Sequence, residues 1–589
     1  MKSHLQELLR EALAALADGV LAGIELPAEL AIERSRDAKN GDFASNIALQ
    51  LAKPAQRKPR ELAELIVARL PASKHVAKVE VAGAGFINFF LSSAASLAVI
   101  GEIIEQAGRF GRNNTGQNKK VLVEFVSANP TGPMHVGHGR GAAYGDSVAN
   151  LLAAIGYDVT REFYVNDAGR QVDILAISVL IRYLELFGEL SNFYFPSRAY
   201  PGEYIRRTAE HLKTSFQKRF HCPGMELFNV EHPMMVGEEK AGSKEEEEAY
   251  IDRLIAKAKD LLGNNYRVFQ EAAVADQRAS IEETLKRFGV EFDHWVSERA
   301  LVESGKAEAA IRRLEDSGYT VEEDNALWLK TDELGDEKKR VLKKADGSAT
   351  YFCNDIAYHM DKLDRGFERL LDVWGADHHG YIARVRAALE ALTGRRDVLD
   401  VQLIQFVTLS SGRMGKRSGN FVTFDDLLNE AGKDATRFFY LLRGNDQHLE
   451  FDIELARSQT NENPVFYVQY AHARICSVEK QMRDKGFAYD GALALTSLEQ
   501  LTEAHEQALL TRLARYPEVV EQAALQYAPH TLVHYLRDLA DDFHSYYNAH
   551  QFLVEDAVLR NARLALIWAT RQVLNSALQL LGVTPAESM

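Results

Sequence analysis

The chain has 589 residues, which is too long for one hydrophobic core and predicts about three or four structural units. Its 46% hydrophobic and 26% charged residues are typical of a soluble globular protein. No uninterrupted apolar run approaches the roughly 20 residues that span a bilayer, so we expect no membrane span. The formal net charge of −15 argues against nucleic-acid binding as a bulk property, but it leaves room for a local basic track.

The first residues and the cysteines are not those expected of a secreted protein. Residues 1–16 predict an amphipathic helix with acidic residues, which is not the pattern of a signal or transit peptide. Cys222, Cys353 and Cys476 are far apart and have neither metal-ligand spacing nor a disulfide framework. A reducing, cytoplasmic setting fits this composition best.

Residues 1 to about 115 predict a small α+β unit. Residues 44–52 follow a helical pattern, and residues 76–81 and 85–89 look like strands separated by a glycine turn. The polar, basic stretch 109–120 predicts a linker. Taken alone, this unit says nothing about function, and an accessory dimerisation module is an alternative.

The stretch VLVEFVSANPTGPMHVGH (121–138) predicts a strand, a turn and the start of a helix. Apolar residues alternate up to Phe125, and the two prolines that follow end the strand. Helical periodicity then continues to Gly156. A helix that opens with His135, Gly137 and His138 suits a phosphate, because its amides and imidazoles can donate hydrogen bonds. The histidine motif alone would also fit a strand–turn–helix with incidental histidines.

Strands and helices alternate from about residue 116 to 455, which predicts a doubly wound parallel sheet with ligands at the carboxyl ends of its strands. The pattern loosens over about 185–265, which predicts an insertion. We expect residues 351–355, after the Asp-Gly turn at 346–347, to form a strand that runs into a helix. Asp377, His378 and His379 follow another predicted strand, but no further ligands at suitable spacing support a metal site.

The loop SGRMGKRSGN (411–420) carries Arg413, Lys416 and Arg417 between glycines. Such a loop can neutralise a polyphosphate, although a solvated turn is the ordinary explanation. From about residue 456 the chain predicts a helical bundle. Its segment 463–475 carries aromatic and basic side chains that could stack on splayed bases: Tyr467, Gln469, Tyr470, His472 and Arg474.

Together these stretches resemble the arginyl-tRNA synthetases, which are class I aminoacyl-tRNA synthetases. VEFVSANPTGPMHVGHGR resembles the first class I signature, His-x-Gly-His, in its arginyl context. NGDFASNIALQLAK and GAGFINF resemble the N-terminal domain of that family, and NPVFYVQYAHARI resembles its anticodon-binding bundle. RMGKR (413–417) resembles the second signature, Lys-Met-Ser-Lys-Ser, imperfectly: Arg413, Gly415 and Arg417 replace the first lysine and both serines.

The resemblance covers essentially the whole chain and implies its organisation. Residues 1–115 would form an α+β domain that contacts the tRNA corner. Residues 116–455 would form a Rossmann-type α/β catalytic domain, and residues 456–589 an all-α anticodon-binding bundle. The implied activity is arginine–tRNA ligation, with tRNA present before arginine is activated.

The resemblance also implies roles for particular residues. Glu298, Tyr351 and Asp355 would clasp the guanidinium of arginine, because carboxylates accept its paired hydrogen bonds. Glu124, Ser127 and Asn129 would hold the ammonium and carboxylate end, with Asp377 and His378 nearby. A buried unpaired carboxylate is costly, so Glu124 inside an apolar strand is itself a functional candidate. The implied ATP-binding residues are His135, Gly137, His138, Arg413, Met414, Lys416 and Arg417, of which His135, His138 and Lys416 would be catalytic. The implied tRNA contacts are Tyr467, Gln469, Tyr470 and Arg474.

The expected substrates are arginine, tRNA and ATP with Mg²⁺, with no tightly bound metal or organic cofactor, no DNA or membrane partner, and a monomeric chain. Three alternatives remain. A cysteinyl synthetase would need a thiol-selective zinc site, which three scattered cysteines do not supply. A non-catalytic tRNA-binding paralogue would be expected to lose a signature residue, and a nucleotidyltransferase without tRNA would leave the helical unit without a role.

Overall fold

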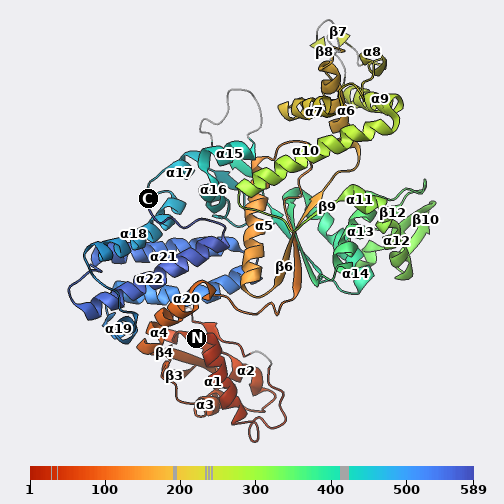
Figure 1. Ribbon diagram of the computed structural model, residues 1–589. Helices are drawn as coiled ribbons and strands as arrows, with labels where there is room; N and C mark the ends of the chain where they lie inside the picture. Colours follow the sequence, from red (N-terminus) through yellow and green to blue (C-terminus); the bar gives the residue numbers. More distant parts are fainter. Residues whose placement is uncertain are drawn as a thin grey trace.

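The computed structural model describes residues 1–27, 30–35, 37–189, 195–232, 235–236, 239–240, 243–410 and 423–589. Within these residues the chain forms an N-terminal lobe, a central region around a parallel sheet, and a C-terminal helical bundle (Figure 1). No described helix is both long enough and apolar enough to cross a lipid bilayer.

The N-terminal lobe is a four-stranded antiparallel sheet covered by helices. The sheet order is β1 (Glu33–Arg34), β2 (Phe43–Ser45), β4 (Phe86–Leu91) and β3 (Val76–Ala82). The helices are α1 (Lys2–Ala14), α2 (Ile47–Ala52) and α3 (Pro59–Val67). The predicted helix over 44–52 is therefore shorter than expected, because residues 43–45 pair with β4 as a strand. The lobe has its own apolar core, in which Leu9, Phe43 and Phe89 are fully buried.

The central sheet has five parallel strands, which confirms the predicted fold class. Its order is β14 (Leu399–Ile404), β13 (Arg369–Gly375), β5 (Lys120–Glu124), β6 (Asp158–Val165) and β9 (His294–Ser297). The chain runs from β5 outward through β6 to β9, and later through β13 to β14 on the other side. The connectivity therefore reverses between β5 and β13, which is where open α/β sheets bind ligands.

Helix α5 (Val136–Ala154) and the C-terminal part of α10 (Tyr266–Arg287) share the apolar core on one face of this sheet, and α14 (Ile382–Thr393) shares the core on the other face. The helices α11 (Glu298–Glu303), α12 (Lys306–Asp316) and α13 (Tyr351–Asp364) form a further core with α14. Helix α6 (Arg170–Glu185) follows β6 and leads into the insertion. Helix α5 packs so closely on the end of β5 that a Cβ atom at Gly145 would lie 2.2 Å from the Phe125 ring, which only glycine avoids. Beside the parallel sheet lies a separate antiparallel sheet of β10 (Thr320–Glu323), β11 (Ala326–Leu329) and β12 (Arg340–Lys343).

The predicted strand at 351–355 is wrong, because helix α13 begins at Tyr351. The Thr350 side chain caps it by accepting a hydrogen bond from the Cys353 amide (3.3 Å). An N-cap of this kind satisfies an amide that has no partner inside the helix. Tyr351 and Asp355 therefore lie one helical turn apart on one face, rather than on alternate faces of a strand.

The insertion forms a small helical lobe. It contains α7 (Glu203–Phe216), α8 (Gly224–Leu227), β7 (Met235–Val236), β8 (Glu239–Lys240) and α9 (Lys244–Leu262). These helices share a separate apolar core with α6 and the start of α10. In Figure 1 this lobe projects from the body at the far end of α10.

The remainder of the chain leads into the C-terminal bundle. β15 (Val407–Leu409) pairs with β16 (Leu449–Phe451), and α15 (Phe424–Ala431), α16 (Lys433–Tyr440) and α17 (Ile453–Arg457) lie near them. The bundle contains α18 (Pro464–Asp484), α19 (Gly491–Thr496), α20 (Ala504–Leu525), α21 (Pro529–Ala549) and α22 (Ala557–Leu580), and α4 (Ser93–Gln106) packs against α20 and α22. One continuous apolar core joins this bundle to α5 and β5 of the central region.

Candidate active site

A pocket of about 480 Å³ opens at the carboxyl ends of β5, β6, β9 and β13. Five of the residues assigned to arginine from the sequence line it together: Glu124, Ser127, Glu298, Tyr351 and Asp355. They come from the ends of two strands, β5 and β9, and from α13, although Glu124 and Asp355 are far apart in the sequence. The fold therefore brings most of the predicted substrate residues to one place.

Two predicted residues do not line this pocket. The Asn129 side chain instead donates to the Gln171 side chain at the start of α6 (3.1 Å). The Asp377 side chain is 66% exposed and lies 3.6 Å from that of His378, which does line the pocket. Within the described part of the chain, no three His, Cys, Asp or Glu side chains are grouped closely enough to hold a metal ion.

The backbone turns sharply where β5 ends. Val126 and Ser127 have φ angles of +68° and +39°, a left-handed conformation that β-branched residues rarely adopt. Such a conformation costs about 1–3 kcal/mol per residue and persists only where the surroundings enforce it. Here it lets the Ser127 hydroxyl donate to Glu124 (2.9 Å) and accept from the Tyr164 amide (3.1 Å).

Glu298 is held in the pocket by its neighbours in the chain. Asp167, beyond the end of β6, accepts hydrogen bonds from the Ser297 hydroxyl (2.6 Å) and from the Arg299 amide (2.9 Å). Glu298 between them is 6% exposed. Burial, together with the charges of Asp167 and Asp355, raises the pKa of Glu298. A cationic ligand would therefore be favoured beside it.

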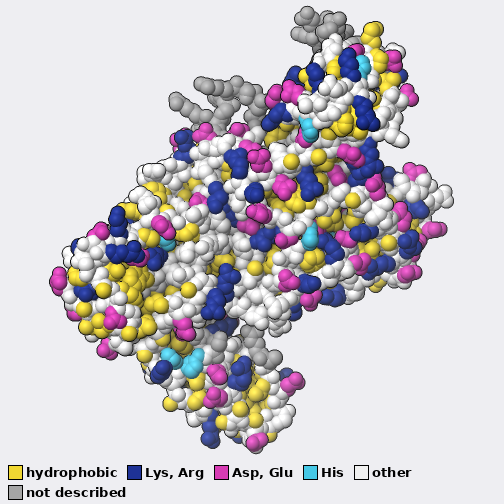
Figure 2. Space-filling model, in the orientation of Figure 1, with side chains coloured by type: hydrophobic (Ala, Val, Ile, Leu, Met, Phe, Trp, Pro, Cys, Tyr) yellow, Lys and Arg dark blue, Asp and Glu magenta, His cyan; other side chains and the backbone are white. Residues whose placement is uncertain are grey.

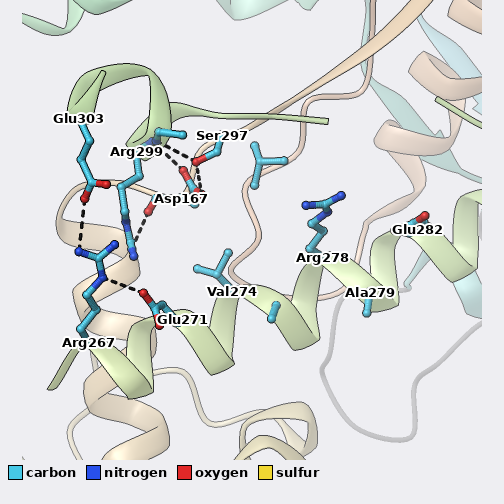
Figure 3. Close-up of a pocket in the computed structure, with 13 residues that line it drawn as sticks. Asp167, Arg267, Glu271, Val274, Arg278, Ala279, Glu282, Ser297, Arg299 and Glu303 are labelled. Atoms are coloured by element: carbon cyan, nitrogen blue, oxygen red, sulfur yellow. Dashed lines mark hydrogen bonds and ion pairs between the residues drawn. The ribbon is translucent and has the colours of Figure 1, made fainter. Parts of the chain in front are cut away.

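A second pocket of about 520 Å³ lies on the other side of Asp167, between α10 and α11 (Figure 3). Arg267 forms ion pairs there with Glu271 (2.7 Å) and Glu303 (3.4 Å). Arg278 lies further along the same helix and makes no dashed contact in the view. The pocket thus combines acidic and basic groups that largely pair with each other.

The two signature histidines begin helix α5 with stacked rings, whose centroids are 3.6 Å apart. His135 Nδ1 accepts from the Gly137 amide (3.1 Å), and His138 Nδ1 accepts from the His135 amide (3.2 Å). An accepting Nδ1 carries no proton, so each neutral ring keeps its N–H donor at Nε2. Burial lowers the pKa of His135, and burial with the neighbouring His135 lowers that of His138 to about 3. Both rings are therefore neutral hydrogen-bond donors at physiological pH.

The second signature, with Arg413, Met414, Lys416 and Arg417, lies outside the described residues. The residues that follow it contact the first signature. The Phe424 amide donates to the Met134 carbonyl (2.8 Å), and Thr423 pairs with His135 in an antiparallel bridge.

The tRNA residues predicted in α18 already make contacts within the chain. The Arg474 guanidinium lies over the rings of Tyr470 (4.3 Å) and Tyr547 (4.6 Å), and it contacts His544. The Gln469 side chain donates to the Thr584 carbonyl (2.7 Å). His472 is buried and bonds the Ala586 carbonyl (2.7 Å), which is a structural contact. Tyr467 is half-buried beside His544, with ring centroids 4.5 Å apart.

Several residues that line the pocket were not predicted from the sequence: Tyr164, Asn166, Tyr358, His359, Asp372, Trp374 and Tyr381. Two signals could have revealed some of them. Asp372, like Glu124, is a carboxylate inside an apolar strand. Tyr351, Asp355 and His359 are spaced four residues apart, as on one face of a helix.

Comparisons with known proteins account for nearly the whole chain. Residues 3–91 match the family described as arginyl tRNA synthetase N terminal domain. Residues 99–187 and 224–458 match the catalytic domain of the tRNA synthetases class I (R), and residues 468–589 match the DALR anticodon binding domain.

Full-length relatives agree. An arginine–tRNA ligase of Thioalkalivibrio sulfidiphilus is 52% identical over 596 residues, and one of Legionella pneumophila strain Paris is 48% identical over 594, each covering 100% of both chains. The arginyl-tRNA synthetase structure of Thermus thermophilus has the same fold, with a TM-score of 0.73 and 23% identity over 100% of both chains. The chain belongs to the arginyl-tRNA synthetases, within class I of the aminoacyl-tRNA synthetases.

Proposed function

We propose that this chain is an arginine–tRNA ligase whose arginine site is the pocket between β5, β9, β13 and α13. The observation that carries the proposal is that Glu298 and Asp355 line this pocket together with Glu124. In the first step a carboxylate oxygen of arginine attacks the α-phosphorus of ATP and pyrophosphate leaves. In the second step a hydroxyl of the terminal tRNA ribose attacks the arginyl carbonyl carbon and AMP leaves.

Glu298, Asp355 and Tyr351 would select the guanidinium. Its planar set of donors can bond two carboxylates and a hydroxyl at once. Lysine has the same charge but a single ammonium, and it would leave some of these groups unpaired in a partly buried site. Glu124 and Ser127 would hold the ammonium and carboxylate end. Asn129, whose side chain bonds Gln171 outside the pocket, would join them only by exchanging that partner for the substrate. Asp377 would contribute only from the exposed rim.

His135, Gly137 and His138 would bind the ATP phosphates. The Nε2–H donors of the two rings, and the amides that begin α5, suit phosphate oxygens and the charge that develops at the α-phosphate. Lys416, with Arg413, Met414 and Arg417, would stabilise the departing pyrophosphate, as the match to the second signature suggests. Mg²⁺ would enter with ATP and screen the same charge.

We assign tRNA contact to the two outer units, residues 1–115 and 456–589, and the chemistry to residues 116–455. In the C-terminal unit the aromatic rings of Tyr467 and Tyr470, with Arg474, suit stacking on bases, whereas the amide donors of Gln469 are partly engaged within the chain. Basic and acidic side chains interleave on the face in Figure 2, so a polyanion would bind along local tracks rather than one broad basic field. We expect a monomer that acts in the cytoplasm.

The test is arginine-dependent exchange of pyrophosphate into ATP, with and without total tRNA, with lysine and cysteine as controls. Exchange with arginine alone among the amino acids, and only with tRNA, is the expected result. Exchange without tRNA would retain the ligase but remove the dependence on tRNA. No exchange from a folded sample in either condition would refute the proposal in favour of a non-catalytic tRNA-binding protein.

A further inference from the structure

Three buried carboxylates form a row across the middle of the sheet. In the strand register Asp372 of β13 is the partner of Glu124 of β5, and Glu124 is the partner of Glu162 of β6. Their exposed fractions are 0%, 7% and 0%. Adjacent buried carboxylates repel one another and are stable only when cations or donors neutralise them.

Helix α13 supplies those groups from its C-terminal half and from the residue that follows it. Arg365, just beyond its end, donates to both oxygens of Glu162 (2.6 and 2.9 Å), and the Tyr358 hydroxyl donates to the same carboxylate (2.7 Å). Lys362 lies at the centre, with Nζ 2.5 Å from Glu124 Oε2 and 3.0 Å from Asp372 Oδ1. The helix therefore serves the pocket at one end and this carboxylate row at the other.

His359 is charged in this arrangement, as its two partners require. Its Nδ1 faces the Asp355 carbonyl (2.8 Å) and its Nε2 faces Asp372 Oδ2 (2.8 Å), and both of these atoms are acceptors. Both ring nitrogens must then carry hydrogen. Although burial and Lys362 lower the pKa of His359, the charge of Asp372 and its hydrogen bond raise it overall. Lys362 and His359 thus balance Glu124 and Asp372.

The Lys362 side chain does not reach the pocket. Its side chain is 0% exposed, it is absent from the pocket lining, and Nζ lies 4.3 Å from the centroid of the Tyr358 ring. Glu124 does line the pocket, and each of its oxygens is fixed from behind. Ser127 donates to Oε1, and Lys362 donates to Oε2. Each oxygen keeps a second acceptor site for a ligand.

We propose that Lys362 is a positioning residue for the substrate, which fixes and charge-balances Glu124 so that this carboxylate can accept hydrogen bonds from the α-ammonium of arginine. The inference rests on the proposed function and deepens it. Lys362 acts only through Glu124 and does not touch the substrate. Its effect must therefore appear in the binding of arginine, not of ATP, and must vanish when Glu124 is already lost.

The test measures arginine and ATP KM values by pyrophosphate exchange at saturating tRNA. Lys362→Met keeps the length of the buried stem and removes its charge. We expect it to raise the arginine KM about tenfold or more, because Glu124 is left buried without its cation, and to leave the ATP KM within about twofold. Lys339→Met is the matched control, since Lys339 is a partly exposed cation that pairs with Glu323, and its KM values should match the wild type.

The decisive comparison is between Glu124→Gln and the double variant Lys362→Met/Glu124→Gln. The double variant removes one buried charge of each sign and retains the Asp372–His359 pair, so it leaves no buried charge without a partner. It should therefore fold, and the test can be made, even if Lys362→Met alone does not fold. We expect its arginine KM to lie within about twofold of that of Glu124→Gln, because contacts that act as one unit are not additive. A further rise of about fivefold or more, or an unchanged arginine KM in folded Lys362→Met, would refute the role of Lys362.

The wild-type protein separates this inference from the proposed function. Arginine-dependent exchange by the wild type, with no change in arginine KM in the Lys362 variant, overturns only the positioning role. Absence of arginine-dependent exchange in the wild type overturns both.

Discussion

Replacing Asp355 by asparagine removes a pocket charge with almost no change in shape. Asp355 lies on the pocket face of α13 and accepts a hydrogen bond from Tyr381. A hydrogen bond between charged groups contributes about 1.5–3 kcal/mol. Asp355 is 28% exposed and an amide oxygen can still accept, so the lower part of this range, about 1.5–2 kcal/mol, applies. This corresponds to a rise of about 10- to 30-fold in the arginine KM.

Pyrophosphate exchange at saturating ATP and tRNA measures this change directly. Asp364→Asn is a suitable control on the same helix, because Asp364 is 53% exposed and pairs with Arg313 away from the pocket. We expect its arginine KM to remain that of the wild type. A rise of less than about twofold in Asp355→Asn, or an equal rise in the ATP KM, would show that Asp355 does not bind the guanidinium.

Four further predictions follow from the same contacts. Arg140→Met should lower the free energy of unfolding by about 3 kcal/mol, because the buried guanidinium donates to three backbone carbonyls and each bond contributes about 1 kcal/mol. Urea unfolding measures this loss, and a loss below about 1 kcal/mol would contradict the prediction. The pKa of His138 is lowered in the folded protein, so below about pH 6.5 this histidine takes up a proton in the unfolded chain but stays neutral in the folded protein until about pH 3. The free energy of unfolding should therefore decrease as the pH is lowered from about 6.5 to about 3, and it should decrease less steeply in His138→Asn. Asp167→Asn should weaken the hydrogen bonds that Asp167 accepts from Ser297 and Arg299, which fix Glu298 between them, and should raise the arginine KM about three- to tenfold. A change in the ATP KM alone would contradict this role of Asp167. Lys416→Ala should depress the rate of exchange with only a modest change in arginine KM, and an unchanged rate would remove Lys416 from the catalytic residues.

The sequence was most informative where local pattern and chemistry coincide. The strand β5, the turn after it and helix α5 follow from alternating apolar residues, two prolines and a helical stripe. The strand predicted at 351–355 shows the limit of this approach, since an aromatic residue after a hairpin turn also fits the start of a helix. Two features identify the helix: the Thr350 side chain caps its first turn, and Tyr351, Asp355 and His359 follow one another at intervals of four residues. Because the first turn of this helix was expected to be a strand, Tyr351 and Asp355 could not be placed on the same helix as Lys362.

Partners across the sheet could not be predicted in the same way. Nothing in the sequence places Asp372 beside Glu124, because strand register depends on the packing of the whole sheet. Similarly, the left-handed backbone at Val126 and Ser127 contradicts the preferences of both residues and is imposed by their surroundings. Asn129 lies near the pocket in sequence, yet its side chain bonds Gln171 instead.

The apolar core shared by the central sheet and the C-terminal bundle limits how this chain can be dissected. Val123 and Val148 belong to the same cluster as Leu536 and Leu566. A cut near residue 456 follows the change in composition, but it would divide that cluster and expose apolar surface on both fragments. The N-terminal lobe, in contrast, encloses its own core and could be exchanged between relatives as a module. The bundle that matches an anticodon binding domain and the sheet that carries the candidate pocket thus share one apolar core, so we expect a substitution that loosens the bundle to lower the stability of the central region as well.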